Sequence, residues 1–326
     1  MEESDGLTYA EAGVDIDREA EAIEALIEET GEFSGDYAGF VDIGDRYLAV
    51  ATDCVGTKIL VADAVGDFST LGIDAIAMNV NDLLAGGFTP TAFVDYLAVA
   101  EPDPDIFREI GEGLAIGAEL GEVALLGGET SVIPEIVTRL DLAGTAVGLA
   151  AHDELLSGTA APGDVLVGVP SNGIHANGLT LARAAATRNH DFEDPFPGDE
   201  SISVGDALLE PTRIYSELRE PLQTHDVTGA AHITGGGWLN LFRLGKHRYV
   251  VDNPFEPHAI FDFVQTEGQV AADEMYRTFN MGTGFVISLE ADAADSFVRT
   301  VTDASVIGEV HEGDATVEIA DLSMTP

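Results

Sequence analysis

The chain has few basic residues. Its 326 residues include 14 Lys and Arg against 59 Asp and Glu, which gives a formal net charge of −45, and the two lysines are Lys58 and Lys246. Nucleic acids and anionic membranes are bound by clusters of Lys and Arg, so we expect this protein to bind neither. Because 45% of the residues are hydrophobic, we expect the chain to fold and its carboxylates to coat the surface. Counter-ions in a very salty cytoplasm would screen the repulsion, and unfolding at low salt would support this halophilic interpretation.

Cysteine and long apolar runs are also nearly absent. The single cysteine, Cys54, cannot form an intrachain disulfide, which predicts a reducing compartment. No stretch approaches the roughly 18 uncharged apolar residues that indicate a membrane span. The acidic N-terminus is not followed by an apolar run, unlike a signal peptide. We therefore expect a soluble, cytoplasmic protein.

The length and the residue patterns predict two domains. At roughly 150 residues per domain, the chain is long enough for two independent cores. Strand and helix patterns alternate in the first half, for example a strand at 46–52 and a helix at 71–84. The polar segment 152–164 contains Gly and Pro and is typical of a linker. We predict an α/β (α+β) chain with an N-terminal domain, 1–151, and a C-terminal α/β domain, 152–326.

The segment 52–58 (TDCVGTK) is the most informative short motif. It places Asp53 at the end of a predicted strand, before a turn that contains Gly56 and Thr57 and ends at Lys58. Asp53 could hold a hard cation, the turn would let the backbone approach a phosphate, and Lys58 would supply a positive charge to that phosphate. The alternative is an ordinary strand-to-turn junction with a solvated lysine.

Two further carboxylates could complete a metal site. Asp82 lies on the polar face of the predicted helix, and Glu129 follows Gly127 and Gly128 at the end of a buried strand. With Asp53 they could bind Mg²⁺, which takes a few carboxylates together with phosphate oxygens. The metal would also let such an acidic protein bind a polyphosphate. The alternatives are a solvent-facing aspartate and a plain turn.

The second half of the chain has two glycine-bearing segments. Residues 171–178 (SNGIHANG) precede a predicted helix, whose first N–H groups could bind an anion, and His175 could transfer a proton there. A helix cap with a structural histidine is the alternative. Residues 234–237 (TGGG) suit a backbone nest around an anion.

Taken in order, these segments resemble the aminoimidazole ribonucleotide synthetase (phosphoribosylformylglycinamidine cyclo-ligase) family of purine biosynthesis. The similarity spans nearly the whole chain. It covers residues 7–17, 52–58, 72–99, 125–130, 171–178, 209–215, 232–237 and 274–284.

The resemblance implies an ATP-dependent ligase that closes a ring. Formylglycinamidine ribonucleotide would be converted to aminoimidazole ribonucleotide, ADP and phosphate through a phosphorylated amide. The implied catalytic residues are Lys58 and His175, and the implied Mg²⁺ ligands are Asp53, Asp82 and Glu129. The implied ATP-phosphate residues are Gly56, Thr57, Lys58, Gly127 and Gly128. The implied residues of the substrate cleft are Asn177, Gly178, Thr234, Gly235, Gly236 and Gly237. The resemblance also implies a homodimer whose N-terminal mixed sheets join into a barrel, with an α/β sandwich as the second domain.

The sequence departs from the family pattern in two places. Cys54 stands where the family usually has glycine, which argues against a catalytic thiol. The segment 31–43 has fewer glycines than the family's loop and no lysine, and Asp36 and Asp42 could substitute there as metal-side residues. Relatives of the same architecture remain as alternatives, namely a thiamine-monophosphate kinase, a selenophosphate synthetase or a non-catalytic maturation protein.

Overall fold

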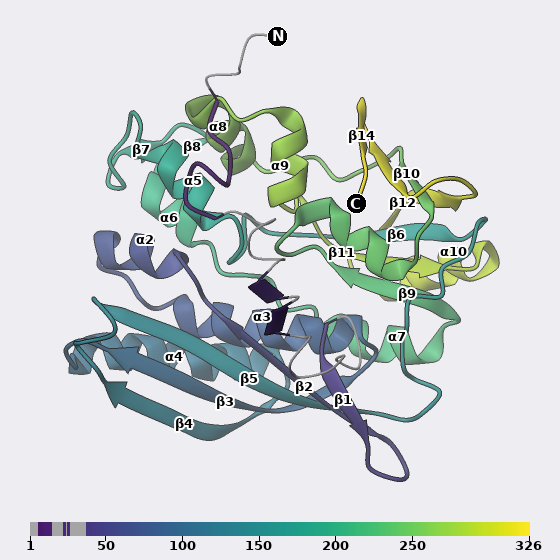
Figure 1. Cartoon of the computed structure of the whole chain (residues 1–326), viewed down its shortest axis with the longest axis horizontal. Helices are drawn as coiled ribbons and strands as arrows, with labels where there is room; N and C mark the ends of the chain where they lie inside the picture. The colour runs from purple at the N-terminus through teal and green to yellow at the C-terminus, as the bar shows by residue number, and fades with distance from the viewer. Residues whose placement is uncertain (1–5, 15–21, 24, 27–36) are drawn as a thin grey trace.

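The protein is built around two β-sheets, one from each half of the chain (Figure 1). The computed structural model describes residues 6–14, 22–23, 25–26 and 37–326. The first sheet has the strand order β1-β2-β5-β3-β4, and the second has the order β14-β13-β10-β12-β6-β11-β9. In this part of the chain no helix has the length and apolar character needed to cross a membrane.

The N-terminal sheet is mixed, as predicted, because β3 pairs antiparallel with β5 and parallel with β4. Helices α3 and α4 pack against each other on one of its faces. The elements are β1 (Gly39–Asp42), β2 (Tyr47–Cys54), α2 (Lys58–Val65), α3 (Leu71–Ala85), β3 (Thr89–Val99), α4 (Pro104–Leu120), β4 (Ala124–Val132) and β5 (Leu140–Ala150).

The C-terminal sheet contains β11, whose seven residues are all buried, next to the edge strand β9. β11 pairs with β6 on one side and with β9 on the other, and buried apolar residues pack on both faces of the sheet. The elements are β6 (Val165–Pro170), α5 (Leu179–Ala186), β7 (Pro195–Phe196), β8 (Asp199–Ser203), α6 (Val204–Leu209), η1 (Ser216–Leu218), α7 (Arg219–Thr224), β9 (Val227–His232), η2 (Gly237–Leu244), β10 (Arg248–Val251), α8 (Ala259–Gly268), α9 (Ala272–Thr278), α10 (Ala291–Thr300), β12 (Ser305–His311), β13 (Thr316–Ile319) and β14 (Leu322–Met324), with β11 at Thr283–Leu289.

Helix α3 joins the two halves of the molecule. It packs on β2 and β5 on one side and on β9 of the second sheet on the other (Figure 1). The sequence correctly predicts this helix, but its polar face is not an outer one, because Asp74 and Met78, which share that face with Asp82, are both buried. The second half of the chain covers that face, and its polar side chains find partners there. Asn81, for example, donates to the carbonyl of Arg213.

Candidate functional site

A cleft of about 580 Å³ lies between residues of the two halves. This volume is in the usual range for a small-molecule site. Most of the residues that the sequence singled out as phosphate or substrate contacts meet in it. The lining residues from that set are Asp53, Gly56, Thr57, Asn177, Gly178, Gly235 and Gly236. Two hydroxyl groups bridge the elements beside it, because Thr57 Oγ1 and Thr180 Oγ1 lie 2.9 Å apart.

Asp53 and Asp82 form an acidic pair next to the cleft. Asp53 is the seventh residue of β2 and shares the parity of the buried Ala49 and Ala51, which places it on the face that α3 covers. Burial raises the pKa of Asp53 to about 6, and the negative charge of Asp82 contributes to the increase. The N–H of Cys54 donates to Asp53 Oδ1 at 2.7 Å and opposes the shift. A cation placed here would relieve both the desolvation and the repulsion.

His232 is a part of this site that the sequence did not identify. Its Nδ1 lies 2.9 Å from Asp82 Oδ1, and its side chain is buried at the end of β9. The two residues are 150 positions apart, and no local pattern connects them. Because His232 engages one oxygen of Asp82, it restricts the orientation of that carboxylate toward the cleft.

The acidic pair fits a divalent cation with hard ligands. Mg²⁺ typically takes one or two protein carboxylates and completes its shell with water and phosphate oxygens. Among the described residues no group of three or more His, Cys, Asp or Glu side chains could hold a metal by itself. A two-carboxylate arrangement therefore suits a cation that arrives with a phosphate ligand better than a cage made of protein alone.

Glu129 does not join this pair, which corrects the prediction of a three-carboxylate site in one chain. It lies on β4 and pairs with Tyr96, whereas Asp53 on β2 is three strands away. Three strand spacings amount to roughly 14 Å. Glu129 also has the opposite parity to Gly128, which packs against Asp95 on the helix-covered face. The strand order of the sheet separates Glu129 from Asp53, and this order cannot be predicted from neighbouring residues in the sequence.

Gly127 and Gly128 are displaced from the cleft for the same reason. Both belong to β4 and neither lines the cleft. A Cβ atom on Gly128 would lie 2.4 Å from Asp95 Oδ1, so this glycine makes room for a carboxylate of the neighbouring strand. Within one chain the two glycines therefore do not reach this cleft, and their predicted phosphate contact stays a prediction.

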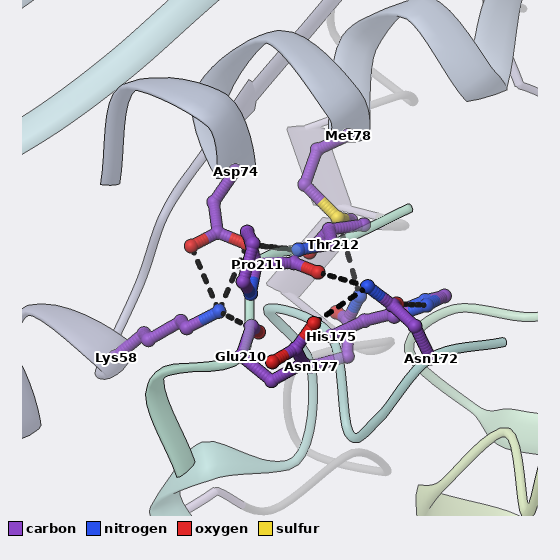
Figure 2. A network of polar contacts seen from close by, with 9 residues as sticks. All are labelled: Lys58, Asp74, Met78, Asn172, His175, Asn177, Glu210, Pro211 and Thr212. Atoms are coloured by element: carbon purple, nitrogen blue, oxygen red, sulfur yellow. Dashed lines mark hydrogen bonds and ion pairs between the residues drawn. The ribbon is translucent and has the colours of Figure 1, made fainter. Parts of the chain in front are cut away.

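Lys58 is buried in an ion pair, which contradicts its predicted contact with phosphate (Figure 2). Its Nζ lies 2.9 and 2.8 Å from the two carboxylate oxygens of Asp74, and it donates to the carbonyl of Glu210 at 2.6 Å. The ammonium group of Lys58 has three N–H donors, and these two carboxylate oxygens and the carbonyl oxygen supply three acceptors. The N–H and hydroxyl of Thr212 also donate to Asp74 Oδ1. Lys58 therefore links α2, α3 and segment 210–212.

His175 lies behind the wall of the cleft. It is buried, and burial together with the nearby positive groups holds its pKa well below the usual value, so the imidazole is neutral. The next two residues, Ala176 and Asn177, line the cleft. Tyr215 and Phe285 stack between His175 and His232, with ring centroids 5.3 to 6.4 Å apart along the series. A continuous aromatic layer thus separates the two histidines.

The segment 234–237, which we call the glycine nest, forms a turn in which the N–H of Gly237 donates to the carbonyl of Thr234 at 2.8 Å. Gly236 and Gly237 have φ angles of 86° and 54°, a region that favours glycine. Asn177 Nδ2 donates to Thr234 Oγ1 at 2.5 Å and so joins this segment to the His175 loop. Among the described residues that line the cleft, Arg243 is the one basic side chain, and its guanidinium lies 4.2 Å from the Tyr37 ring.

The remaining candidates lie outside the cleft or have no catalytic environment. Asp36 is outside the described residues. Asp42 on β1 is exposed and accepts from the N–H of Gly44. Cys54 borders the cleft, but burial and the charge of Asp53 raise the pKa of its thiol. A raised thiol pKa opposes formation of the nucleophilic thiolate.

Comparison with known protein families assigns this architecture. Residues 35–150 match the N-terminal domain of AIR synthase related proteins, and residues 161–320 match the C-terminal domain. The chain belongs to the AIR synthase related family. Within it, the chain is 45% identical to the phosphoribosylformylglycinamidine cyclo-ligase of Methanosarcina acetivorans, over 97% of this chain and 98% of that protein. It is also 45% identical to the enzyme of the same name from Methanothermobacter thermautotrophicus, over 96% and 97% of the two chains.

Solved structures of more distant proteins share the fold. The Aquifex aeolicus thiamine monophosphate kinase superposes with a TM-score of 0.67 at 15% identity, covering 95% of this chain and 99% of that one. Thermotoga maritima PurL in complex with ATP gives a TM-score of 0.58 at 19% identity, over 90% of this chain and 46% of that one. These two matches support the fold and no finer assignment.

Proposed function

We propose that this protein catalyses the ATP-dependent cyclisation of formylglycinamidine ribonucleotide to aminoimidazole ribonucleotide, ADP and phosphate. The observation that carries the proposal is the 45% identity to phosphoribosylformylglycinamidine cyclo-ligases over nearly the full length of both chains. The cleft supports it, since Asp53, Gly235, Gly236 and Arg243 line the same cavity. The enzyme is a ligase of purine biosynthesis.

The chemistry assigns distinct tasks to the residues around the cleft. An amide oxygen is a poor leaving group, and its phosphorylation by ATP lets the amine of the same molecule displace it as phosphate. Reactions of this kind depend mainly on positioning and on stabilisation of phosphate charge. Asp53 and Asp82 would hold Mg²⁺, which supplies positive charge to the ATP phosphates. Gly56, Thr57 and the 234–237 nest offer N–H and hydroxyl donors to phosphate oxygens.

An ADP-release assay with two substrates tests this assignment. With ATP, Mg²⁺ and formylglycinamidine ribonucleotide we expect ADP to form together with aminoimidazole ribonucleotide. With thiamine monophosphate in its place we expect only background ADP. ADP release with thiamine monophosphate but not with the amidine would instead identify a kinase. The assay belongs in concentrated salt, because the chain carries a net charge of −45.

We also propose that two copies of the chain associate through the exposed face of the N-terminal sheet. Val50, Val94 and Tyr96 point away from the helices, and each is about 40% exposed. Val50 pairs with Val147 on β5, the strand that lies between β2 and β3, so apolar side chains are distributed over three neighbouring strands of this face. An exposed apolar sheet face indicates a protein contact, and a second copy is the favoured occupant because two such sheets can close into a barrel. We further propose that the protein works in a cytoplasm that is rich in salt, as its acidic surface suggests, and reducing, as its single cysteine suggests.

Charges placed on this face should separate the two copies. In sedimentation experiments we expect the wild type to sediment as a dimer and the Val94→Glu/Tyr96→Glu variant as a monomer, because a buried unpaired carboxylate opposes association. Ile136→Glu is the matched control, since Ile136 is 78% exposed but lies in the turn after β4. A monomeric wild type would refute the dimer, and a dimeric double variant would refute this interface.

A further inference from the structure

The loop that carries His175 is held from several sides by side chains that do not line the cleft. Asn280 Nδ2 donates to the carbonyls of Gly173 and Ile174, at 2.9 and 3.2 Å. His258 Nε2 lies 2.9 Å from the carbonyl of Ser171 and donates to it. His175 itself has a φ of 68°, which is costly for a residue with a side chain. These contacts hold the loop in place and keep His175 in its strained backbone conformation, so they fix the orientation of its side chain.

The orientation of the Asn172 amide follows from its partners (Figure 2). Asn172 Nδ2 lies 2.8 Å from the carbonyl oxygen of Pro211 and 3.1 Å from Glu210 Oε1. A carbonyl oxygen can only accept a hydrogen bond, so the group that faces it must be the NH₂. The other end of the amide, Oδ1, is therefore an acceptor, and it lies 3.0 Å from His175 Nε2.

This geometry determines the tautomer of His175. Because Asn172 Oδ1 can only accept, His175 Nε2 must carry the hydrogen, and in a neutral ring Nδ1 then carries the lone pair. Nδ1 is buried and has no hydrogen-bond partner in the described part of the chain. Burying an acceptor without a donor costs free energy, so this atom is prepared for a donor from a bound molecule.

The charged groups around His175 favour the neutral ring. Apart from burial, the groups that disfavour its protonation are His232 on β9, Lys58 on α2, His258 at the start of α8 and Arg213 in the 210–215 segment. Lys58 also anchors the segment that positions Asn172, since its Nζ donates to the carbonyl of Glu210. The buried ion pair thus supports the His175 loop through contacts and through its charge.

We propose that Asn172 is a positioning residue that holds His175 as the Nε2–H tautomer, and that an N–H group of the amidine substrate reaches the buried Nδ1 acceptor when the cleft wall at Ala176 and Asn177 shifts. The inference about the substrate rests on the proposed cyclisation. The tautomer itself does not, because it follows from Asn172, Pro211 and His175 alone.

Nitrogen NMR of the whole protein labelled with ¹⁵N-histidine tests the tautomer without any assay of activity. The spectrum of a His175→Gln variant identifies the His175 signals among those of the eight histidines. At about pH 7 we expect an unprotonated Nδ1 and a protonated Nε2. A protonated Nδ1 in the wild type would overturn the proposal, whatever the enzyme does.

Two substitutions separate positioning from packing. In Asn172→Leu the acceptor is lost, and we expect His175 to populate both tautomers. In Asn172→Asp the carboxylate favours a protonated ring, so we expect His175 to titrate at higher pH than in the wild type. Asn253→Leu is the matched control, because Asn253 bonds the carbonyl of Val306 at the surface. Thermal unfolding confirms that each variant is folded, and unchanged His175 signals in both Asn172 variants would refute the role of Asn172.

The substrate contact has its own readout. Addition of formylglycinamidine ribonucleotide without ATP should shift the Nδ1 resonance in the direction of an accepted hydrogen bond. We expect Asn172→Leu to lower kcat at least tenfold, with a smaller change in KM, since a wrong tautomer impairs the reacting complex more than binding. If calorimetry detects binding and the Nδ1 signal does not move, the contact is refuted while the tautomer stands. If the amidine does not bind at all, the proposed cyclisation fails instead.

Discussion

Replacement of Lys58 by methionine should destabilise the folded protein by about 3–5 kcal/mol, as expected when one member of a buried ion pair is removed. Lys58 and Asp74 are both fully inaccessible to solvent. Without the ammonium, the Asp74 carboxylate would keep two donors from Thr212 but would remain as a buried charge without a counter-ion. The measurement is denaturant unfolding at high salt, with the free energy extrapolated to zero denaturant.

A second substitution distinguishes the cause of this loss. In Lys58→Met/Asp74→Asn the remaining amide oxygen can still accept from Thr212, and no charge is buried, so we expect most of the stability to return. The other lysine supplies the control, because Lys246 is exposed and Lys246→Met should change stability by less than about 0.5 kcal/mol. If Lys58→Met abolished ATP binding without loss of stability, the original phosphate assignment would be reinstated.

Replacement of Asp53 by asparagine should lower turnover about a thousandfold, because a bound metal ion supplies several kcal/mol to a transition state of this kind. The same variant should be more stable than the wild type at neutral pH when metal is absent. Burial raises the pKa of Asp53 to about 6 in the folded protein, whereas the ordinary value is 3.8. The ionised carboxylate is therefore less favourable in the folded state than in the unfolded state.

The sign of the pH dependence follows from these two values. Below the unfolded pKa the carboxyl is protonated in both states and contributes no difference. As pH rises from 3.8 to about 6, ionisation of Asp53 lowers the free energy of unfolding of the wild type. Above about pH 6 this contribution no longer changes with pH. Asparagine does not titrate, so the stability difference between Asp53→Asn and the wild type should grow through this window and then level off.

Unfolding curves with a chelator and with Mg²⁺ complete this experiment. We expect Mg²⁺ to stabilise the wild type, as any ligand of the folded state does, and to have little effect on Asp53→Asn. Asp141→Asn is the matched control, because Asp141 lies exposed on the adjacent strand β5. Equal stabilisation of all three proteins by Mg²⁺ would exclude Asp53 as a metal ligand.

Several parts of the fold could be predicted because they depend on neighbours in the chain. The predicted helix at 71–84 is observed as α3 at Leu71–Ala85, and the predicted strand at 46–52 is observed as β2 at Tyr47–Cys54. Hydrophobic periodicity and the terminal glycines carry this information locally. The domain boundary at 151/152 stays a prediction, although the first sheet ends at Ala150 and the second begins at Val165.

The candidate site was predictable only in part. The order of its motifs led to a resemblance that the family comparison confirms, and the cleft does collect Asp53, Asn177, Gly235 and Gly236. Periodicity showed which face of α3 is polar, but it could not show that the second half covers this face. His232 was missed because its partner, Asp82, is 150 residues away.

The family, the local elements and the acidic character of this protein follow from its residues in order, because motifs, periodicity and charge are properties of adjacent or summed residues. Which charges meet depends on how the two halves pack. Strand order separated Glu129 from Asp53, and burial of α3 between the two sheets turned Lys58 from a candidate phosphate ligand into the partner of Asp74. Electrostatic interactions depend on distance and on exclusion of water, and both are set by contacts between residues that are far apart in the chain.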